Sequence, residues 1–406
     1  MRKCVLLSLD ALYDADLAHF APGSFLGDWL AHAAVCTQVK TVFPALTYPA
    51  HTTLVTGCDP ATHGIGQNQP YQPGVDAPMR AWYWDARQVK RSSLFDAVSA
   101  QGGRSASILW PVTGKSRAIR WNFPEVLALP GENQVLKMLA YGAAPWIVRM
   151  ELLHGRQRVS FHEPHLSDYA AILACDVIRR HQPDLTAVHL VDLDDARHHT
   201  GTHSAEASAA LDRLAARVEH IWQQMQQTPG MADAFLALVS DHGQADVSRT
   251  VNLTEALRPA GLTASFGVQS NGMSAYLYPS TPNADPAPLA AFLAENAAAL
   301  GIAHVYPRTE LDALHCISGP VLAVEAAPDV VFSDGLPQAK REKATHGFGP
   351  GHPAENCLLA VRGPGIRQGT MLPAMPMRDV APTLAGLMGV PMPQAEGKDH
   401  SALLLP

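Results

Sequence analysis

Two segments of the chain place carboxylates and imidazoles at spacings that suit metal chemistry. In Asp194-Asp195-Ala-Arg-His198 carboxylates and an imidazole lie a few residues apart, shortly after the apolar run 186–191. In Ser240-Asp241-His242-Gly243 the two side chains are adjacent and directly follow the apolar run 235–239. Oxygen and nitrogen ligands of this kind suit zinc and related divalent metals. Each segment also has an ordinary alternative reading as a capped turn, because Asp is a favoured N-cap residue.

A third segment offers a hydroxyl. Thr47 precedes Tyr48 and Pro49, and Gly57 follows ten residues later, so the pattern predicts a helix that begins at Thr47 and ends at Gly57. The hydroxyl would then lie at the positive end of a helix, where anions bind. A threonine in that place can act as a nucleophile if a metal lowers its pKa, and otherwise it is a plain N-cap.

A glycine-rich loop near the C-terminus carries two further histidines. It reads Thr345-His346-Gly-Phe-Gly-Pro-Gly-His352. One of these histidines could supply a last metal ligand; His346 is the first choice and His352 its rival.

The elements that must position these groups alternate along the chain. Short apolar runs that read as buried strands lie at 4–9, 107–109, 185–191, 235–240 and 358–361, and helical stretches lie between them at 92–100, 169–180 and 205–226. Such alternation predicts an α/β fold with a mostly parallel sheet covered on both faces. The chemical side chains follow strands, Asp10 included, and ligands of open α/β sheets bind at the carboxyl ends of strands.

Two stretches interrupt this alternation. They cover about 114–168 and 253–343, and they are expected to be insertions that cap one end of the sheet. We therefore predict a single domain over 1–406 with a core of about 1–113, 169–252 and 344–406.

Composition excludes several classes of protein. The chain has 406 residues, 47% of them hydrophobic and 17% charged, so it is neither disordered nor fibrous. Its 30 basic and 37 acidic residues give a net charge of −7, which argues against a general nucleic-acid binder. The 19 histidines against 6 cysteines hint at imidazole and carboxylate ligands.

The sequence gives weaker signals about the cellular compartment of the protein and about membrane association. The apolar stretch after the first residues is shorter than a signal-peptide core, and no run approaches the length of a membrane span. The six cysteines are scattered without Cys-x-x-Cys spacing, which favours free thiols in a reducing compartment. The expectation is a cytoplasmic protein without a membrane partner.

Taken in order, these segments resemble the alkaline phosphatase superfamily, and most closely its type I phosphodiesterase/nucleotide pyrophosphatase family. Two further segments support the resemblance: His63-Gly-Ile-Gly-Gln-Asn68 and the tail 378–391. Ala50 and Gln244 depart from the family pattern, where Asn and Met are usual. The resemblance spans the core from Val5 to about Gly397 and leaves both insertions poorly matched. It implies an alkaline-phosphatase-like three-layer sandwich.

The resemblance also implies two zinc sites, although other divalent metals could occupy them. One would use Asp10, Thr47, Asp241 and His242, and the other would use Asp194, His198 and His346. Thr47 would be the nucleophile, and Asn68 would hold a phosphate oxygen. Tyr48 falls where the family places an aromatic residue that can stack on a base, although simple packing is an equal alternative.

The implied activity is hydrolysis of phosphoric esters. Nucleotide-like phosphodiesters are the expected small-molecule substrates, and phosphomonoesters and phosphonates follow because related families use the same metal core. Sulfate esters and mutase chemistry are disfavoured by the missing Cys-x-Pro-x-Arg segment and by the threonine at position 47. A non-catalytic relative would be expected to lack at least one ligand, and all seven positions are present. The sequence gives no indication of oligomeric state.

Overall fold

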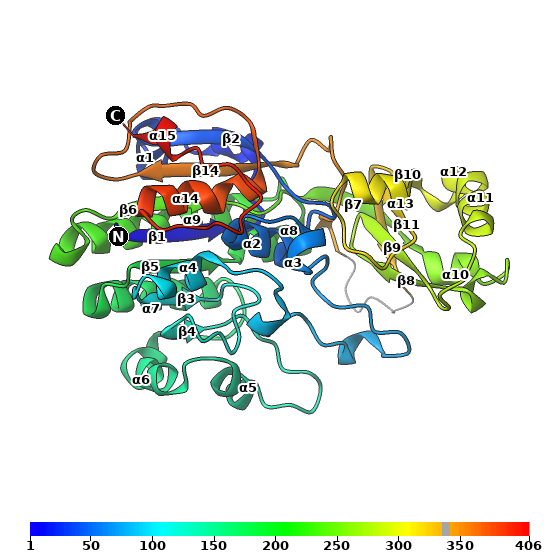
Figure 1. Cartoon of the computed structure of the whole chain (residues 1–406), viewed down its shortest axis with the longest axis horizontal. Helices are drawn as coiled ribbons and strands as arrows, with labels where there is room; N and C mark the ends of the chain where they lie inside the picture. Colours follow the sequence, from blue (N-terminus) through cyan, green and yellow to red (C-terminus); the bar gives the residue numbers. More distant parts are fainter. Residues whose placement is uncertain (335–341, 406) are drawn as a thin grey trace.

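The computed structural model describes residues 1–334 and 342–405 and is built around one large sheet (Figure 1). Strands β6, β1, β5, β3 and β4 run parallel to one another, whereas β14 is antiparallel to both β2 and β6. The α/β class with a mostly parallel central sheet is therefore confirmed. In spatial order the strands are β15 (Met375–Pro376), β2 (Ala34–Lys40), β14 (Asn356–Arg362), β6 (Phe235–Val239), β1 (Cys4–Leu9), β5 (Leu185–Leu190), β3 (Ser105–Ile108) and β4 (Trp121–Phe123).

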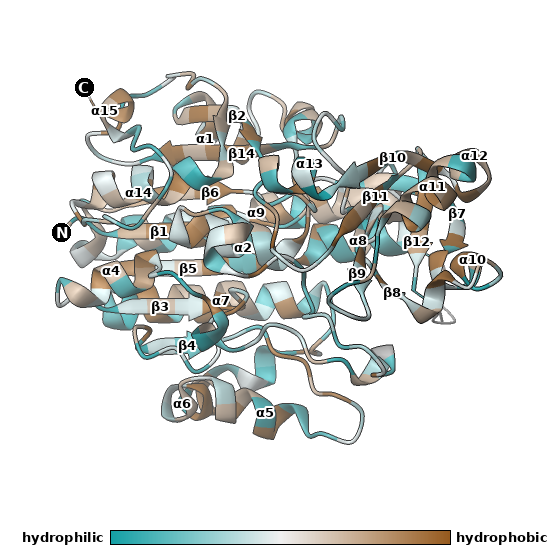
Figure 2. Ribbon diagram, turned by 45° about the vertical axis from the view of Figure 1, so that its right-hand side comes forward, coloured by the Kyte–Doolittle hydropathy of each residue, from teal (hydrophilic) through white to brown (hydrophobic). Residues whose placement is uncertain are grey.

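The central strands are apolar because both faces of the sheet are covered. Every residue of β1, β5 and β6 is buried. Successive side chains of a strand point to opposite faces, and β1 accordingly places Leu7 and Leu9 in one core cluster and Cys4 and Leu6 in another. The sheet therefore lies between two layers, and its central strands are coloured largely as hydrophobic in Figure 2.

Helices cover the two faces in separate groups. One face packs against α7 (His165–His181) and α9 (Ala205–Gln227), and the other against α2 (Thr47–Thr56), α4 (Leu94–Ala100) and α14 (Val380–Met388). The predicted helices at 92–100, 169–180 and 205–226 correspond to α4, α7 and α9. The remaining helices of this core are α1 (Phe25–Ala31), α3 (Pro60–His63), α8 (Asp192–Thr200) and α15 (Ser401–Leu404).

The two predicted insertions differ in structure. The range 114–168 holds α5 (Gln134–Tyr141) and α6 (Ala144–His154), and it also supplies β4 at the edge of the main sheet. The range 253–343 forms much of the lobe at the right of Figure 1, and its part 335–341 lies outside the described residues. The division into a core with two caps stays a prediction.

The lobe has its own sheet and hydrophobic core. Four antiparallel strands lie in the order β10-β11-β9-β8, and a second, three-stranded sheet joins β12 to β7 (Ala245–Asn252) and β13 (Ala344–Thr345). The lobe elements are α10 (Leu253–Leu257), β8 (Phe266–Ser270), β9 (Ser274–Pro279), α11 (Ala287–Glu295), α12 (Ala297–Leu300), β10 (Ile302–Pro307), α13 (Arg308–Ala313), β11 (Leu322–Ala326) and β12 (Asp329–Ser333).

The described helices are short or polar relative to a membrane span. Within residues 1–334 and 342–405, none is both long and apolar enough to traverse a bilayer.

Candidate active site

Three neighbouring strands bring the predicted metal ligands to one edge of the sheet. Strands β6, β1 and β5 are parallel neighbours, so their carboxyl ends meet. Asp10 follows β1, Asp241 and His242 follow β6, and α8 begins directly after β5. Residues far apart in sequence therefore converge because the strands that precede them are adjacent.

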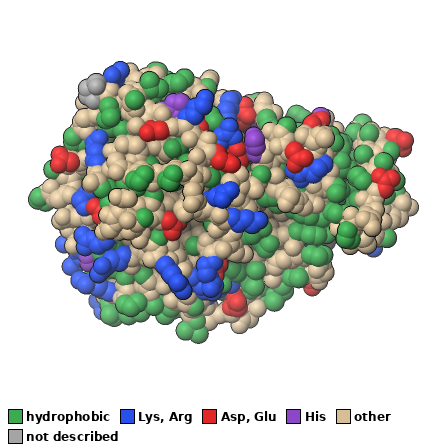
Figure 3. All heavy atoms as spheres, in the orientation of Figure 1, with side chains coloured by type: hydrophobic (Ala, Val, Ile, Leu, Met, Phe, Trp, Pro, Cys, Tyr) green, Lys and Arg blue, Asp and Glu red, His purple; other side chains and the backbone are tan. Residues whose placement is uncertain are grey.

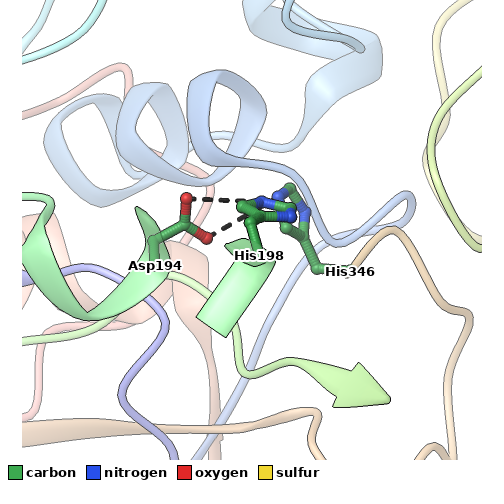
Figure 4. A group of neighbouring side chains, drawn as sticks. All are labelled: Asp194, His198 and His346. Carbon is green, nitrogen blue, oxygen red and sulfur yellow. Dashed lines mark ion pairs between the residues drawn. The ribbon is translucent and has the colours of Figure 1, made fainter. Parts of the chain in front are cut away.

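The first ligand group consists of Asp194, His198 and His346 (Figure 4). Asp194 and His198 lie one turn apart on α8, with 3.4 Å between Asp194 Oδ2 and His198 Nε2. His346 follows β13 and places its Nε2 3.9 Å from Asp194 Oδ1. The rival, His352, instead stacks on the ring of Phe348 at 4.1 Å. The geometry therefore favours His346 as the last ligand.

The second ligand group consists of Asp10, Asp241 and His242, all of them buried. His242 Nε2 lies 3.2 Å from Asp241 Oδ2 and 3.6 Å from Asp10 Oδ1. The imidazole rings of His242 and His346 stack with centroids 3.8 Å apart, so the two groups are immediate neighbours.

Both groups offer carboxylate oxygens and imidazole nitrogens that could bind a cation. Asp10 and Asp241 each use one carboxylate oxygen in a protein hydrogen bond, to His189 and to the backbone of Ala11. Their other oxygens, Asp10 Oδ1 and Asp241 Oδ2, are buried and both face His242 Nε2, and neither has a hydrogen-bond partner within residues 1–334 and 342–405. Buried polar atoms are rarely left unpartnered, so these two oxygens fit a bound cation.

The three ligand histidines are held in one tautomer. Nδ1 of His198 donates to the carbonyl of Ala344 at 2.9 Å, and Nδ1 of His346 donates to that of Ala45 at 2.9 Å. Nδ1 of His242 lies 3.3 Å from its neighbour's carbonyl oxygen. Each ring therefore keeps its Nδ1 proton on a carbonyl and turns its Nε2 toward the site, which is how a backbone carbonyl orients a histidine for a metal.

Burial and charge shift the pKa values of the ligands. Burial, followed by the charge of Asp194, raises the pKa of Asp10 to about 6, and burial with the charge of Asp10 holds the pKa of Asp241 well above its usual range. Burial and the neighbouring imidazole of His346 hold the pKa of His242 well below its usual range. Crowded carboxylates of this kind retain protons unless a cation is supplied.

The charged pair in the first group behaves differently. Burial alone would raise the pKa of Asp194, but the imidazole of His198 lowers it below the ordinary range. Conversely, Asp194 raises the pKa of His198 to about 10 against the opposing effect of burial.

We expect the raised pKa of Asp10 to make the metal-free protein less stable as the pH rises, whereas the lowered pKa of His242 acts in the opposite direction. The folded Asp10 keeps its proton up to about pH 6, whereas the unfolded carboxyl loses it near ~4. Between these values the folded state binds more protons, so the free energy of unfolding falls with increasing pH. In thermal melts of chelated protein the melting temperature of the wild type should fall relative to that of Asp10→Asn between pH 5 and pH 7, and added Zn²⁺ should raise it more at pH 7.

The control for this expectation is Asp10→Asn. The variant cannot ionise at that position, so its melting temperature should decline less over the same interval. An equal decline in both proteins would contradict the assignment to Asp10.

Thr47 lies beside the second ligand group, as its predicted role requires. Its Oγ1 is 3.2 Å from His242 Nε2. The predicted helix is present as α2 and ends at Gly57, which has a positive φ of 65°. The expectation that Thr47 caps this helix is wrong: Leu46 is the N-cap residue, and Thr47 is the first helical residue. Its hydroxyl is therefore available to the site.

Asn68 lies next to the same helix start. Its Oδ1 accepts a hydrogen bond of 3.0 Å from the backbone N–H of Tyr48. This bond orients the carboxamide, and Asn68 lines a cavity of about 280 Å³ together with His198 and His346. Its position suits the predicted contact with a phosphate oxygen.

Tyr48 is not among the residues that line this cavity. The residue is fully buried, and its hydroxyl donates to Glu125 at 3.1 Å. Trp82 and Phe332 are the aromatic residues that line the cavity, and Trp82 contacts the ring of Tyr48 edge-on at 5.3 Å. The sequence offered Trp82 as one member of the cluster Trp82-Tyr83-Trp84, for which packing in the core was the preferred interpretation over lining the pocket.

His189 and Glu125 support the site and were missed in the sequence. His189 Nε2 donates to Asp10 Oδ2 at 2.9 Å, and its Nδ1 lies 3.1 Å from Glu125 Oε2. Burial would lower the pKa of His189, but these two carboxylates raise it well above its usual range. A titratable side chain inside the wholly buried strand β5 was the available signal.

Glu125 thereby links the two sides of the site. One of its oxygens contacts His189, which holds Asp10, and the other accepts from Tyr48, whose backbone holds Asn68. The first predicted insertion therefore contributes a side chain to the support of the ligands.

We expect Glu125→Gln to lower zinc affinity and activity about 10- to 100-fold, which is typical for partners of metal ligands. The change removes the charge that fixes His189 while keeping the size of the side chain. Zinc affinity measured by competition with a chelator would test this. Glu132→Gln is the control, because Glu132 lies in the same segment but pairs with Lys137. Equal affinity in both variants would contradict the role of Glu125.

Gln244 holds Asp194 from the other side. Its Nε2 donates to the Asp194 carboxylate, and the sequence had marked this position only as a departure from the family pattern.

Glycine is required at position 347 because the backbone of Asn271 passes very close to it. Its φ is 95°, and a Cβ at this position would lie 1.7 Å from the carbonyl oxygen of Asn271. Any side chain would therefore displace His346 from the lobe that supports it.

Comparison with known proteins places these features in context. A family model described as type I phosphodiesterase/nucleotide pyrophosphatase matches residues 4–349. Human ectonucleotide pyrophosphatase/phosphodiesterase family member 1 is 23% identical over 220 residues, which cover 51% of this chain and 19% of that protein. A bis(5'-adenosyl)-triphosphatase of Xenopus laevis is 21% identical over 64% of this chain and 52% of its own length.

Solved structures agree on the fold. Murine ectonucleotide pyrophosphatase/phosphodiesterase 5, as an inactive threonine-to-alanine variant in complex with AMP, superposes with a TM-score of 0.76 at 17% identity and covers all of both chains. The human protein of the same name gives 0.72 at 20% identity, covering 99% of this chain and all of that one. The predicted alkaline-phosphatase-like architecture is thereby confirmed.

Proposed function

Because the chain belongs to the type I phosphodiesterase/nucleotide pyrophosphatase family, we propose that it hydrolyses phosphoric esters with Thr47 as the nucleophile. One observation carries this proposal: the Thr47 hydroxyl lies 3.2 Å from His242 Nε2, inside the group formed by Asp10, Asp241 and His242. The inactive threonine-to-alanine variant of the murine neighbour, which was solved with AMP, supports both the nucleophile and a nucleotide-like ligand.

Two divalent metals, zinc in the first instance, are part of the proposal. Asp194, His198 and His346 would hold one, and Asp10, Asp241 and His242 would hold the other with the Thr47 oxygen. When bound, such metals lower the pKa of a hydroxyl and neutralise the charge of a phosphate ester.

In the proposed reaction, Thr47 supplies the attacking oxygen, and Asn68 and the start of α2 stabilise the phosphate oxygens. The Thr47 hydroxyl gives up its proton to solvent, and its oxygen bonds to phosphorus while the bond to the leaving oxygen breaks. Water hydrolyses the resulting phosphothreonine and restores the hydroxyl. The free amide of Asn68 and the positive end of α2 stabilise the non-bridging oxygens in both steps.

Substrate class is tested with three compounds. We expect the metal-loaded protein to hydrolyse an aryl phosphodiester faster than an aryl phosphomonoester or an alkyl phosphonate. A more than tenfold preference for the monoester would instead assign a phosphomonoesterase. No turnover of any of them, with both metals present, would identify a non-catalytic relative.

The cytoplasm remains the proposed location. All six cysteines are buried and free, which is consistent with a reducing compartment. Cell fractionation with an antibody to the chain would test it, and recovery in the secreted fraction would contradict it.

A further inference from the structure

A second cavity lies apart from the ligand groups and has a volume of about 550 Å³. Thr52, Val55 and Thr56 of α2 form one wall, while Thr47 at the start of the same helix faces the candidate active site. None of the seven predicted metal ligands lines this cavity. Its volume falls within the range of about 300–1,000 Å³ that is usual for small-molecule sites.

The cavity is rimmed by positive charge in a chain whose net charge is −7. Five basic residues line it, and Asp96 is the only acidic residue among the lining residues; the five are Arg87, Lys90, Arg91, Lys115 and Arg117. The carboxylate of Asp96 is already engaged, because it accepts hydrogen bonds from the backbone and hydroxyl of Ser93 at 2.8 and 2.7 Å. Figure 3 shows Lys and Arg side chains gathered on the face that carries α2 and α4.

Three of these cations have no acidic partner among the described residues. Arg87 and Lys115 both pair with Asp85. Lys90, Arg91 and Arg117 form no ion pair with any residue in the described ranges 1–334 and 342–405. Like charges gathered around a hollow repel one another, and a bound anion relieves that repulsion.

The floor of the cavity is apolar. Val55, Phe95, Val112 and Ile119 line it, and each of them is buried. An apolar floor under a cationic rim suits a ligand with a flat or apolar body and a multiply charged anionic group.

We propose that this cavity is a second ligand site that binds a small organic phosphate, such as a nucleoside monophosphate. Lys90, Arg91 and Arg117 contact the phosphate, and the apolar floor holds the body of the ligand. A nucleic-acid polymer is disfavoured, because the cations surround a hollow and the net charge of the chain repels a polyanion. The site does not depend on the activity proposed above.

Calorimetric titration of the metal-loaded protein with AMP tests the proposal. We expect two binding sites in the wild type, one at the metals and one in the cavity. The triple variant Lys90→Gln, Arg91→Gln, Arg117→Gln should lose at least about tenfold in affinity at the second site only. Its turnover of an aryl phosphodiester should stay within about twofold of the wild type. The second site should also weaken as salt is added, because its phosphate contacts are exposed.

A matched control variant distinguishes binding in the cavity from a general effect of the net charge of the protein. Arg149→Gln, Arg156→Gln, Arg367→Gln removes the same charge from three exposed arginines outside the cavity, and it should keep both sites. Thr47→Ala should also keep both, so an inactive protein would still report on the cavity.

Several results would overturn the proposal. One would be a single AMP site in the wild type, and another would be two unchanged sites in the cavity variant. Inorganic phosphate binding in the cavity as tightly as AMP would refute the role of the apolar floor. A single-stranded oligonucleotide that binds more tightly than AMP, and only when the three cations are present, would assign the surface to a polymer instead.

Discussion

Thr47→Ala is expected to reduce turnover of an aryl phosphodiester by at least about a thousandfold while two metals remain bound. The reason is that removal of a nucleophile eliminates the bond-forming step, whereas the remaining ligands still hold the cations. The hydroxyl is the group that lies 3.2 Å from His242 Nε2. Steady-state kinetics together with metal analysis of the purified variant would measure both effects.

The same helix offers a control. Thr56 is buried at the other end of α2, and its hydroxyl donates only to the backbone of Thr52. Thr56→Ala makes an identical chemical change and should leave the rate within a few-fold of the wild type. Wild-type-like turnover by Thr47→Ala would exclude Thr47 as the nucleophile, and loss of both metals would show that it acts mainly as a ligand.

The second large effect is expected when either ligand group loses one of its carboxylates. Asp241→Asn and Asp194→Asn should each reduce the bound metal from two ions to one and lower activity by at least about a thousandfold, because both ions contribute to an in-line displacement. The two changes combined should leave no metal and cost little further activity, since residues that act as a unit are non-additive.

Asp241→Asn carries an additional signature. Burial and the charge of Asp10 raise the pKa of Asp241, so its ionised form destabilises the metal-free fold at neutral pH. The amide removes that charge but can still accept the hydrogen bond from the Ala11 N–H. Metal-free Asp241→Asn should therefore melt at a higher temperature than metal-free wild type at pH 8. A lower melting temperature would indicate a structural role for the carboxylate.

The ligand residues could be predicted from sequence because their signals are local. Asp241 and His242 are adjacent after an apolar strand, and Asp194 and His198 lie one helical turn apart. Alternation of strands and helices then places the ends of such strands at one edge of the sheet. The choice between His346 and His352 was the open point, because both lie in the same glycine-rich loop.

The residues that support the ligand groups, His189 and Glu125, could not be predicted in this way. His189 is 179 residues from Asp10 in sequence, and Glu125 lies in a segment where the sequence showed no recognisable motif. Their contact depends on the pairing of β1 with β5, which aligns Ser8 with His189, and on the path of the chain after β4. A lone histidine in an apolar strand carries no information about the partner that it meets.

The sequence by itself determined the fold class and the residues of the two predicted ligand groups, because hydropathy period and side-chain chemistry are properties of short segments. Only the tertiary structure decided which oxygens of Asp10 and Asp241 stay unpartnered and which ring lines the cavity near the metals. It also decided that Lys90, Arg91 and Arg117 surround one hollow. These features arise from contacts between distant segments, and such contacts are set by packing.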